Sequence, residues 1–129
     1  EPGVQVFDSN GKFLKRWGSI GRDDGQSTIP QEHIAVDSKD RVYIVDGASN
    51  PRVQIFDTNG KFLGKIGTPC KMATGEGCSD PDGPGPFEKG DGQLSKPEHV
   101  SIDSDGNVFV VDRGNQRVLV FAPVINESS

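Results

Sequence analysis

The chain has 129 residues and a formal net charge of −5 at pH 7, with 14 Lys or Arg against 19 Asp or Glu. An acidic chain without clustered Lys and Arg is poorly suited to follow nucleic-acid phosphates, so nucleic acid is not expected as a partner. The sequence also has no apolar run of transmembrane length, and its 17 Gly and 9 Pro indicate a β-protein rich in turns.

The first predicted element is a hairpin. Residues 4–7 read VQVF, the turn segment DSNG follows, and residues 12–17 return as KFLKRW. Alternating apolar residues on both sides of an Asn-Gly turn are typical of two antiparallel strands. Residues 18–28 are polar and rich in Gly, which indicates a connection, and they contain no catalytic motif.

Four further strands are expected between residues 30 and 67. The short apolar run HIAVD is typical of an inner strand, and VYIVD, RVQIFD and KFLGKIG follow it, separated by turn residues. The segment VQIFDTNGKFLGKIG at 53–67 nearly repeats VQVFDSNGKFLKRWG at 4–18. The hairpin is therefore a partial copy of this unit.

A third copy begins at Pro97. His33–Asp46 reads HIAVDSKDRVYIVD and aligns without a gap with HVSIDSDGNVFVVD at His99–Asp112, after which RVLVF at 117–121 matches RVQIF at 52–56. Repeats of this size form units that bury their apolar faces only against one another.

These motifs, H-[IV]-x-[VI]-D-S-x-x-x-V-[YF]-[IV]-V-D, then N-x-R-V and F-D-x-N-G-K-F-L-x-x-x-G, resemble NHL repeats, the family that builds six-bladed β-propellers. The resemblance implies an all-β fold made of propeller blades, about two and a quarter of the six in a ring. It implies no single function, because one fold carries many functions. RNA-binding proteins, scaffolds and a metal-dependent lyase all use such repeats.

The expected organisation is one propeller domain over residues 1–129: a partial blade at 4–18, a full blade at 30–67, an inserted loop at 68–90 and a partial blade at 97–121. Nine antiparallel strands are too few to close a ring, so the remaining blades are expected from the same longer chain or from other chains. A fragment of a longer protein is favoured. The residues predicted to be buried between blades are Ile34, Val36, Tyr43, Val45, Val100, Ile102, Phe109 and Val111.

Charged residues recur at equivalent places in the copies. Asp at a strand end usually accepts hydrogen bonds from turn backbone, and an Arg found in each copy usually pairs with an Asp or a carbonyl of an adjoining blade. We therefore assign structural roles rather than catalytic or metal-binding roles to Asp37, Asp46, Asp103, Asp112, Arg52 and Arg117.

The inserted loop holds the only two cysteines, Cys70 and Cys78. Their spacing in a Gly-rich segment favours a disulfide, and free thiols or a metal site are the alternatives, although no C-x-x-C pair supports zinc. A disulfide would place the protein in an oxidising space, extracellular or at the cell surface.

The same loop carries carboxylates that could hold calcium: Asp80 and Asp82 stand one residue apart before a Gly, and Asp91 follows. The prolines and glycines around them already account for the segment as a rigid loop rich in turns, and this interpretation is favoured over calcium binding. Asn126 begins an N-x-S sequence and is a candidate for glycosylation.

His33 and His99 are the only histidines, and each stands just before an inner strand. In a propeller both would lie near the mouth of the central channel, where two imidazoles could bind Zn²⁺. The resemblance adds a precedent, because peptidyl-hydroxyglycine lyase of the same family holds a channel zinc with histidines from different blades. The favoured interpretation, however, is two channel-lining polar groups bonded to water or carbonyls.

Two function classes follow. The favoured one is a non-enzymatic scaffold or binding module that presents loops to a protein, peptide or glycan partner. The other is a lyase or hydrolase that uses a divalent metal at His33 and His99 to polarise a carbonyl or water. No nucleophile triad, P-loop or dinucleotide motif indicates other chemistry.

Overall fold

The structure, a computed structural model, describes residues 3–27, 31–46, 51–69 and 93–122. Within these ranges it contains eleven β-strands and one 3₁₀ turn. The strands are β1 (Val4–Phe7), β2 (Phe13–Trp17), β3 (Gln31–Val36), β4 (Val42–Asp46), β5 (Arg52–Phe56), β6 (Phe62–Ile66), β7 (Thr68–Pro69), β8 (Gln93–Leu94), β9 (Pro97–Ile102), β10 (Val108–Asp112) and β11 (Arg117–Phe121), and the 3₁₀ turn η1 is Arg113–Asn115.

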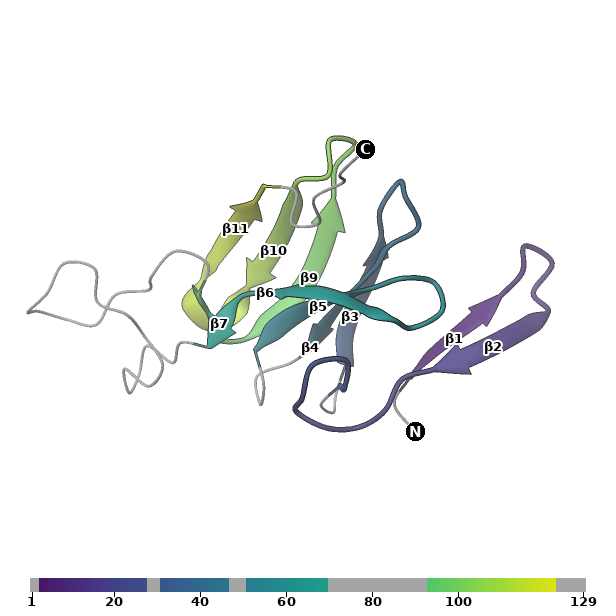
Figure 1. Ribbon diagram of the computed structural model, residues 1–129. Coiled ribbons are helices and arrows are strands. Elements are labelled where there is room, and N and C mark those ends of the chain that lie inside the picture. The colour runs from purple at the N-terminus through teal and green to yellow at the C-terminus, as the bar shows by residue number, and fades with distance from the viewer. Residues whose placement is uncertain (1–2, 28–30, 47–50, 70–92, 123–129) are drawn as a thin grey trace, which may run out of the picture.

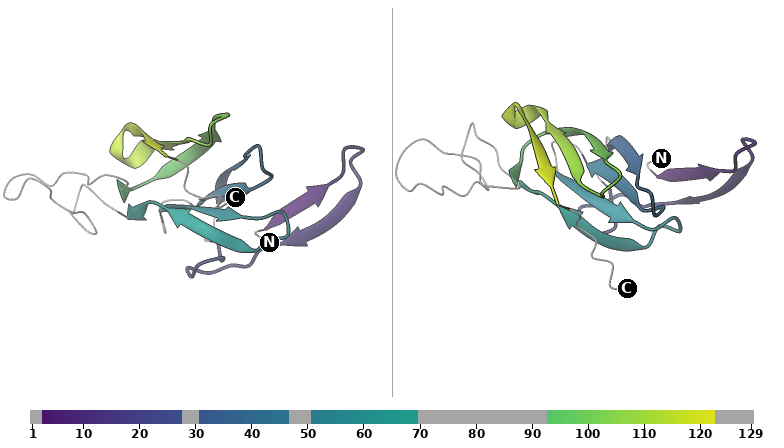
Figure 2. Two further views of the ribbon diagram at one scale, coloured as in Figure 1. Left: turned by 45° about the horizontal axis from the view of Figure 1, so that its top comes forward. Right: turned by 90° about the horizontal axis from the view of Figure 1, so that it is seen from above.

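Three antiparallel sheets stand side by side in chain order (Figures 1 and 2). The hairpin β1–β2 comes first, the four-stranded sheet β3-β4-β5-β6 lies in the middle, and the three-stranded sheet β9-β10-β11 follows. In each sheet every strand pairs with its neighbour in the sequence, as expected of propeller blades. The all-β blade architecture and the nine predicted strands are confirmed.

Two short strands were not predicted. Thr68 and Pro69 of β7 pair in parallel with Gln93 and Leu94 of β8, so this pair joins the two ends of the inserted segment. Periodicity cannot reveal a strand of two residues, because it shows no alternation.

The main apolar core lies between the four-stranded and the three-stranded sheet. Strands β4 and β5 contribute one wall, β9 and β10 contribute the other, and Leu94 is enclosed between them at 0% exposure. Its buried members are Tyr43, Val45, Val53, Ile55, Ile66, Leu94, Val100, Val108, Val110 and Leu119. Packing of one sheet face on another is what a unit too small for its own core requires.

The predicted buried set is partly wrong. Tyr43, Val45 and Val100 are buried, and Ile102 and Phe109 are half-buried. The three exceptions, Ile34, Val36 and Val111, are exposed at 48%, 57% and 41%.

The sheet register explains the exceptions. Ile34 pairs with Ile44 while Ala35 pairs with Tyr43, so Ile34 and Tyr43 point to opposite faces of one sheet. In the same way Val110 pairs with Val100, which leaves the neighbouring Val111 on the other face. The exposed residues therefore occupy the two sheet faces that turn away from the main core.

The β1–β2 hairpin packs on the outer part of one of these faces. Its Val4 and Trp17 contact a second cluster of buried residues, Val42, Ile44 and Phe56. The Trp17 indole Nε1 also donates a hydrogen bond of 3.1 Å to the Thr58 carbonyl. The hairpin thus sits where the outer half of a preceding blade would sit.

Four turns have the same hydrogen-bond pattern. The Oδ1 atom of an Asp accepts hydrogen bonds from the backbone N–H groups two and four residues later, at 2.8–3.0 Å. The four residues are Asp8, Asp37, Asp57 and Asp103. The structural role predicted for Asp37 and Asp103 is confirmed.

Other predicted residues lie outside the described ranges: the disulfide pair Cys70 and Cys78, the calcium candidates Asp80, Asp82 and Asp91, and Asn126. In the described part of the chain, no helix has the length and apolar character needed to cross a membrane.

Candidate functional site

Arg52 and Asp46, the recurring Arg and Asp of the middle blade, form a buried ion pair. Arg52 Nε donates to Asp46 Oδ2 at 2.9 Å, and their side chains are only 6% and 0% exposed. The same guanidinium donates through Nη2 to the carbonyls of Asp23, at 3.1 Å, and Gln26, at 2.5 Å. Arg52 therefore ties the connection that follows β2 to its own sheet, in agreement with the structural role predicted from the sequence.

The next blade uses the equivalent Asp in a related way. Asp112 is 0% exposed and accepts hydrogen bonds from the backbone N–H groups of Ser95 and Lys96, at 2.8–3.2 Å. In both blades the Asp at the end of the second strand helps to hold the backbone that precedes the first strand, directly in the case of Asp112 and through Arg52 in the case of Asp46. These carboxylates are thus occupied with holding the fold.

The structure brings the two histidines together. The rings of His33 in β3 and His99 in β9 stack with centroids 3.6 Å apart and planes 31° apart. The backbone N–H of Val100 donates to His33 Nδ1 at 3.4 Å, so that nitrogen acts as an acceptor and carries no proton. The structure places both histidines within the inner strands β3 and β9 rather than just before them.

The stacked arrangement does not by itself make a metal centre. A metal must lie near the plane of each imidazole that binds it, because the nitrogen lone pair lies in the ring plane. Two rings stacked at 3.6 Å with a tilt of 31° direct their lone pairs along roughly parallel planes rather than to one point. Among the described residues, no group of three or more His, Cys, Asp or Glu side chains is placed to hold a metal ion.

The histidine pair should make the fold sensitive to acid. Burial lowers the pKa of His33, and the neighbouring His99 lowers it further. With respect to this group, the folded state is then most stable above the ordinary His pKa of 6.5. Its stability decreases as the pH falls below that value, and it stops decreasing below the lowered pKa of His33. We expect the melting temperature to decrease over this window in a series of thermal melts.

The variant His33→Gln is the matched test of this effect, because it removes the titrating group and keeps a polar side chain. The variant should therefore flatten the decrease in melting temperature that begins as the pH falls below 6.5. An unchanged slope in the variant would contradict a role for the pair.

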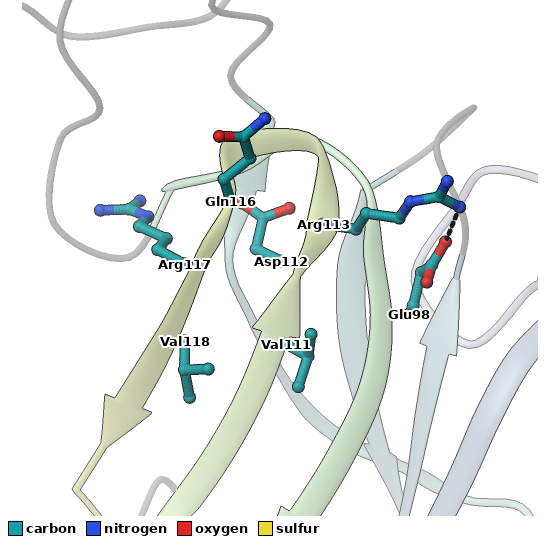
Figure 3. A pocket seen from close by; sticks show the side chains of 7 residues that line it. All are labelled: Glu98, Val111, Asp112, Arg113, Gln116, Arg117 and Val118. Carbon is teal, nitrogen blue, oxygen red and sulfur yellow. Dashed lines mark hydrogen bonds and ion pairs between the residues drawn. The ribbon is translucent and has the colours of Figure 1, made fainter.

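A pocket lies at the end of the last blade, where β10 turns through η1 into β11 (Figure 3). Its volume is about 350 Å³. Val111 and Val118 form its apolar wall, and polar side chains surround them. The residues that line it are Glu98, Val111, Asp112, Arg113, Gln116, Arg117 and Val118.

Two arginines line the pocket, and Figure 3 shows their side chains extending to opposite sides of it, Arg113 toward Glu98 and Arg117 away from it. Arg113 is 67% exposed and its Nη1 pairs with Glu98 Oε1 at 3.1 Å. Arg117 is half-buried and comes from the start of β11. Gln116 has a left-handed backbone at φ 54°, which turns the chain sharply between η1 and β11. A concave site of this kind suits a ligand that combines an apolar group with a carboxylate.

Arg113, Gln116 and Glu98 are not among the site residues predicted from the sequence. The usable signal was a departure from the repeat rather than the repeat itself, because Arg113 stands where the preceding copy has Gly47. A residue that all copies share serves the fold, whereas one that a single copy carries is free to serve binding.

Sequential antiparallel sheets that pack face to face, each with the same Asp turns, define this chain as a set of β-propeller blades. A comparison with protein-family models adds the family: residues 94–121 match the NHL repeat. The match covers β9, β10 and β11, which form the last blade. The chain carries an NHL repeat, as the sequence resemblance predicted.

Proposed function

We propose that this chain is a non-catalytic binding module, and that the pocket at the end of the last blade holds a peptide segment of a partner protein. The observation that supports this proposal is a pocket with an apolar wall, Val111 and Val118, and an arginine on either side of it, Arg113 and Arg117. An apolar side chain of the peptide packs on the valines, and a neighbouring Asp or Glu pairs with the arginines.

The rest of the chain supports a peptide over a nucleic acid. The formal net charge is −5, so two arginines at one pocket form a local site for a carboxylate rather than part of a broad basic surface. Blade loops carried on packed sheets are suitable for such recognition, because the sheets fix the positions of the loop side chains.

A direct test uses two fluorescein-labelled peptides, one with a Glu between two Leu residues and one with Gln in place of the Glu. The Glu peptide should bind more tightly by about a factor of 2 to 5, because Arg113 is exposed and its ion pairs are weak in water. Fluorescence anisotropy measures both affinities.

Arg113→Ala should remove most of the preference for the Glu peptide, while the affinity that the valines contribute to both peptides should remain. Lys65→Ala is the matched control, since Lys65 is a half-exposed cation that pairs with Asp24, far from the pocket residues in sequence. Equal affinities for both peptides, or a preference that survives Arg113→Ala, would contradict the proposed site.

The alternative, a metal-dependent lyase or hydrolase, draws on one observation, the proximity of His33 and His99. It requires the two rings to leave their stacked arrangement and a further ligand to join them. Zinc analysis of the purified protein distinguishes the two functions.

The disulfide of Cys70 and Cys78, and the extracellular or cell-surface location that depends on it, stay predictions.

A further inference from the structure

Two turns of the chain have nearly the same sequence and the same internal hydrogen bond. Residues 8–14 read DSNGKFL and residues 57–63 read DTNGKFL, so each turn has an Asn directly before a Gly. In both turns the Gly backbone N–H donates to the carbonyl of the preceding Asp, at 3.0 Å in the first and 3.2 Å in the second. The two Asn-Gly pairs therefore differ mainly in what surrounds them.

The second turn is covered by the β1–β2 hairpin. Trp17 lies against Gly60, where an added Cβ would stand 2.6 Å from two atoms of the indole. The Trp17 Nε1 donates to the Thr58 carbonyl at 3.1 Å, and the Lys15 ammonium donates to Asn59 Oδ1. Side chains of β2 thus contact three successive residues of this turn.

The first turn is open. Asn10 and Gly11 are exposed, and apart from the chain neighbours of Gly11, no described residue lies within 4 Å of the place that a Cβ on this glycine would take. The hydrogen bonds that hold the turn run between Asp8 and the residues that follow it. Opening the first turn therefore breaks only contacts within the hairpin, whereas opening the second also separates it from β2.

We propose that Asn10 is a site of spontaneous deamidation, and that Asn59 is protected from the same reaction by the hairpin. The backbone nitrogen of Gly11 loses its proton and forms a bond to the side-chain carboxamide carbon of Asn10. The carboxamide nitrogen leaves with that proton as ammonia, and a succinimide ring remains. Water, the only co-reactant, then adds to one of the ring carbonyls and leaves aspartate or isoaspartate at this position.

Two features of the turn decide the rate of this reaction. Glycine has no side chain that would hinder the approach of its nitrogen to the carboxamide. The same nitrogen, however, donates a hydrogen bond to the Asp carbonyl, so the ring forms only in molecules whose turn has opened. The rate at each Asn is therefore set by how often its turn opens, and the turn beside Trp17 opens less often.

The product differs from the original turn in charge and in shape. Either product places a carboxylate at position 10, close to the Asp8 carboxylate that accepts the backbone N–H of this residue at 2.9 Å. Isoaspartate also adds a methylene group to the backbone of the turn. We therefore expect the deamidated hairpin to be held less firmly than the original one. This inference does not depend on the proposed peptide site.

The experiment is incubation of the complete chain in a mildly alkaline buffer over several days, followed by trypsin digestion and mass spectrometry. Cleavage after Lys12, Arg52 and Lys61 gives peptides 1–12 and 53–61, which both end in NGK. Deamidation raises the mass of either peptide by about 1 Da. Peptide 1–12 should convert about tenfold faster than peptide 53–61, because only the second turn is covered.

The chain unfolded in urea is the reference, because the reacting groups and their neighbours are nearly the same at both sites. Its two peptides should convert at similar rates. Lys15→Ala should raise the rate at Asn59 by about a factor of 2 to 5, since it removes one contact that holds the turn, and should leave the rate at Asn10 unchanged. Lys65→Ala is the matched control, because Lys65 pairs with Asp24 and should change neither rate.

Four results would overturn the proposal. In the folded protein these are equal rates at the two sites, a faster reaction at Asn59, or no reaction at Asn10 when the unfolded chain reacts at both sites. The fourth is an unchanged rate at Asn59 in the Lys15→Ala protein, which would mean that the hairpin does not protect this turn.

Discussion

Replacing Arg52 with Met is expected to lower the free energy of unfolding by about 3–5 kcal/mol, the usual cost of leaving a buried charge without its partner. The Asp46 carboxylate is 0% exposed and would lose the Arg52 Nε donor at 2.9 Å. The carbonyls of Asp23 and Gln26 would lose their shared donor as well. Urea unfolding followed by circular dichroism measures the change.

Two further variants make this result specific to the buried pair. Arg117→Met at the equivalent position of the last blade should cost less, because Arg117 is half-buried and water reaches it more easily. Adding Asp46→Asn to Arg52→Met should recover part of the lost stability, since it removes the stranded charge. Equal losses of unfolding free energy in Arg52→Met and Arg117→Met would argue against a special contribution of the buried Arg52–Asp46 ion pair.

The strands and turns could be predicted because their signals are local and repeated. Asp8, Asp37, Asp57 and Asp103 each form the same turn, and a turn that depends on hydrogen bonds within five residues is visible in the sequence. The apolar runs between these turns then had to be strands.

The burial of each strand face could not be predicted in the same way. Ile34 and Tyr43 are both apolar and stand in paired strands, yet they point to opposite faces. A strand with apolar residues on both faces does not reveal which face a neighbouring sheet covers. That depends on the sheets present beside it, as the exposure of Val36 and Val111 shows.

The candidate sites, like the fold, could be predicted from the sequence only in part. Repeat symmetry indicated that His33 and His99 occupy equivalent places in neighbouring blades, and the structure shows that their rings stack. The stacking of their rings and the hydrogen bond from Val100 depend on side-chain rotamers, which no sequence pattern fixes. The pocket at Arg113 was missed because Arg113 and Gln116 depart from the repeat, while most of the other residues that line the pocket follow it.

Replacing Phe56 with Ala is expected to lower the free energy of unfolding by about 3–5 kcal/mol and to loosen the β1–β2 hairpin. Phe56 is 1% exposed, and its ring centroid lies 5.0 Å from that of Trp17 and 6.0 Å from that of Phe62. Removing the ring leaves a cavity under Trp17, the only tryptophan of the chain, so the fluorescence of the folded protein should also shift toward longer wavelength.

Phe7→Ala is the control on the hairpin itself. Phe7 is 51% exposed and its ring packs on that of Phe13, so its replacement should cost less than about 1 kcal/mol and leave the fluorescence unchanged. A Phe56→Ala protein with full stability but altered fluorescence would mean that the hairpin contributes nothing to the fold of the middle blade. A Phe56→Ala protein that loses stability and also shifts its fluorescence means that the hairpin and the middle blade unfold as one unit, because Phe56 belongs to the middle blade and packs against the hairpin.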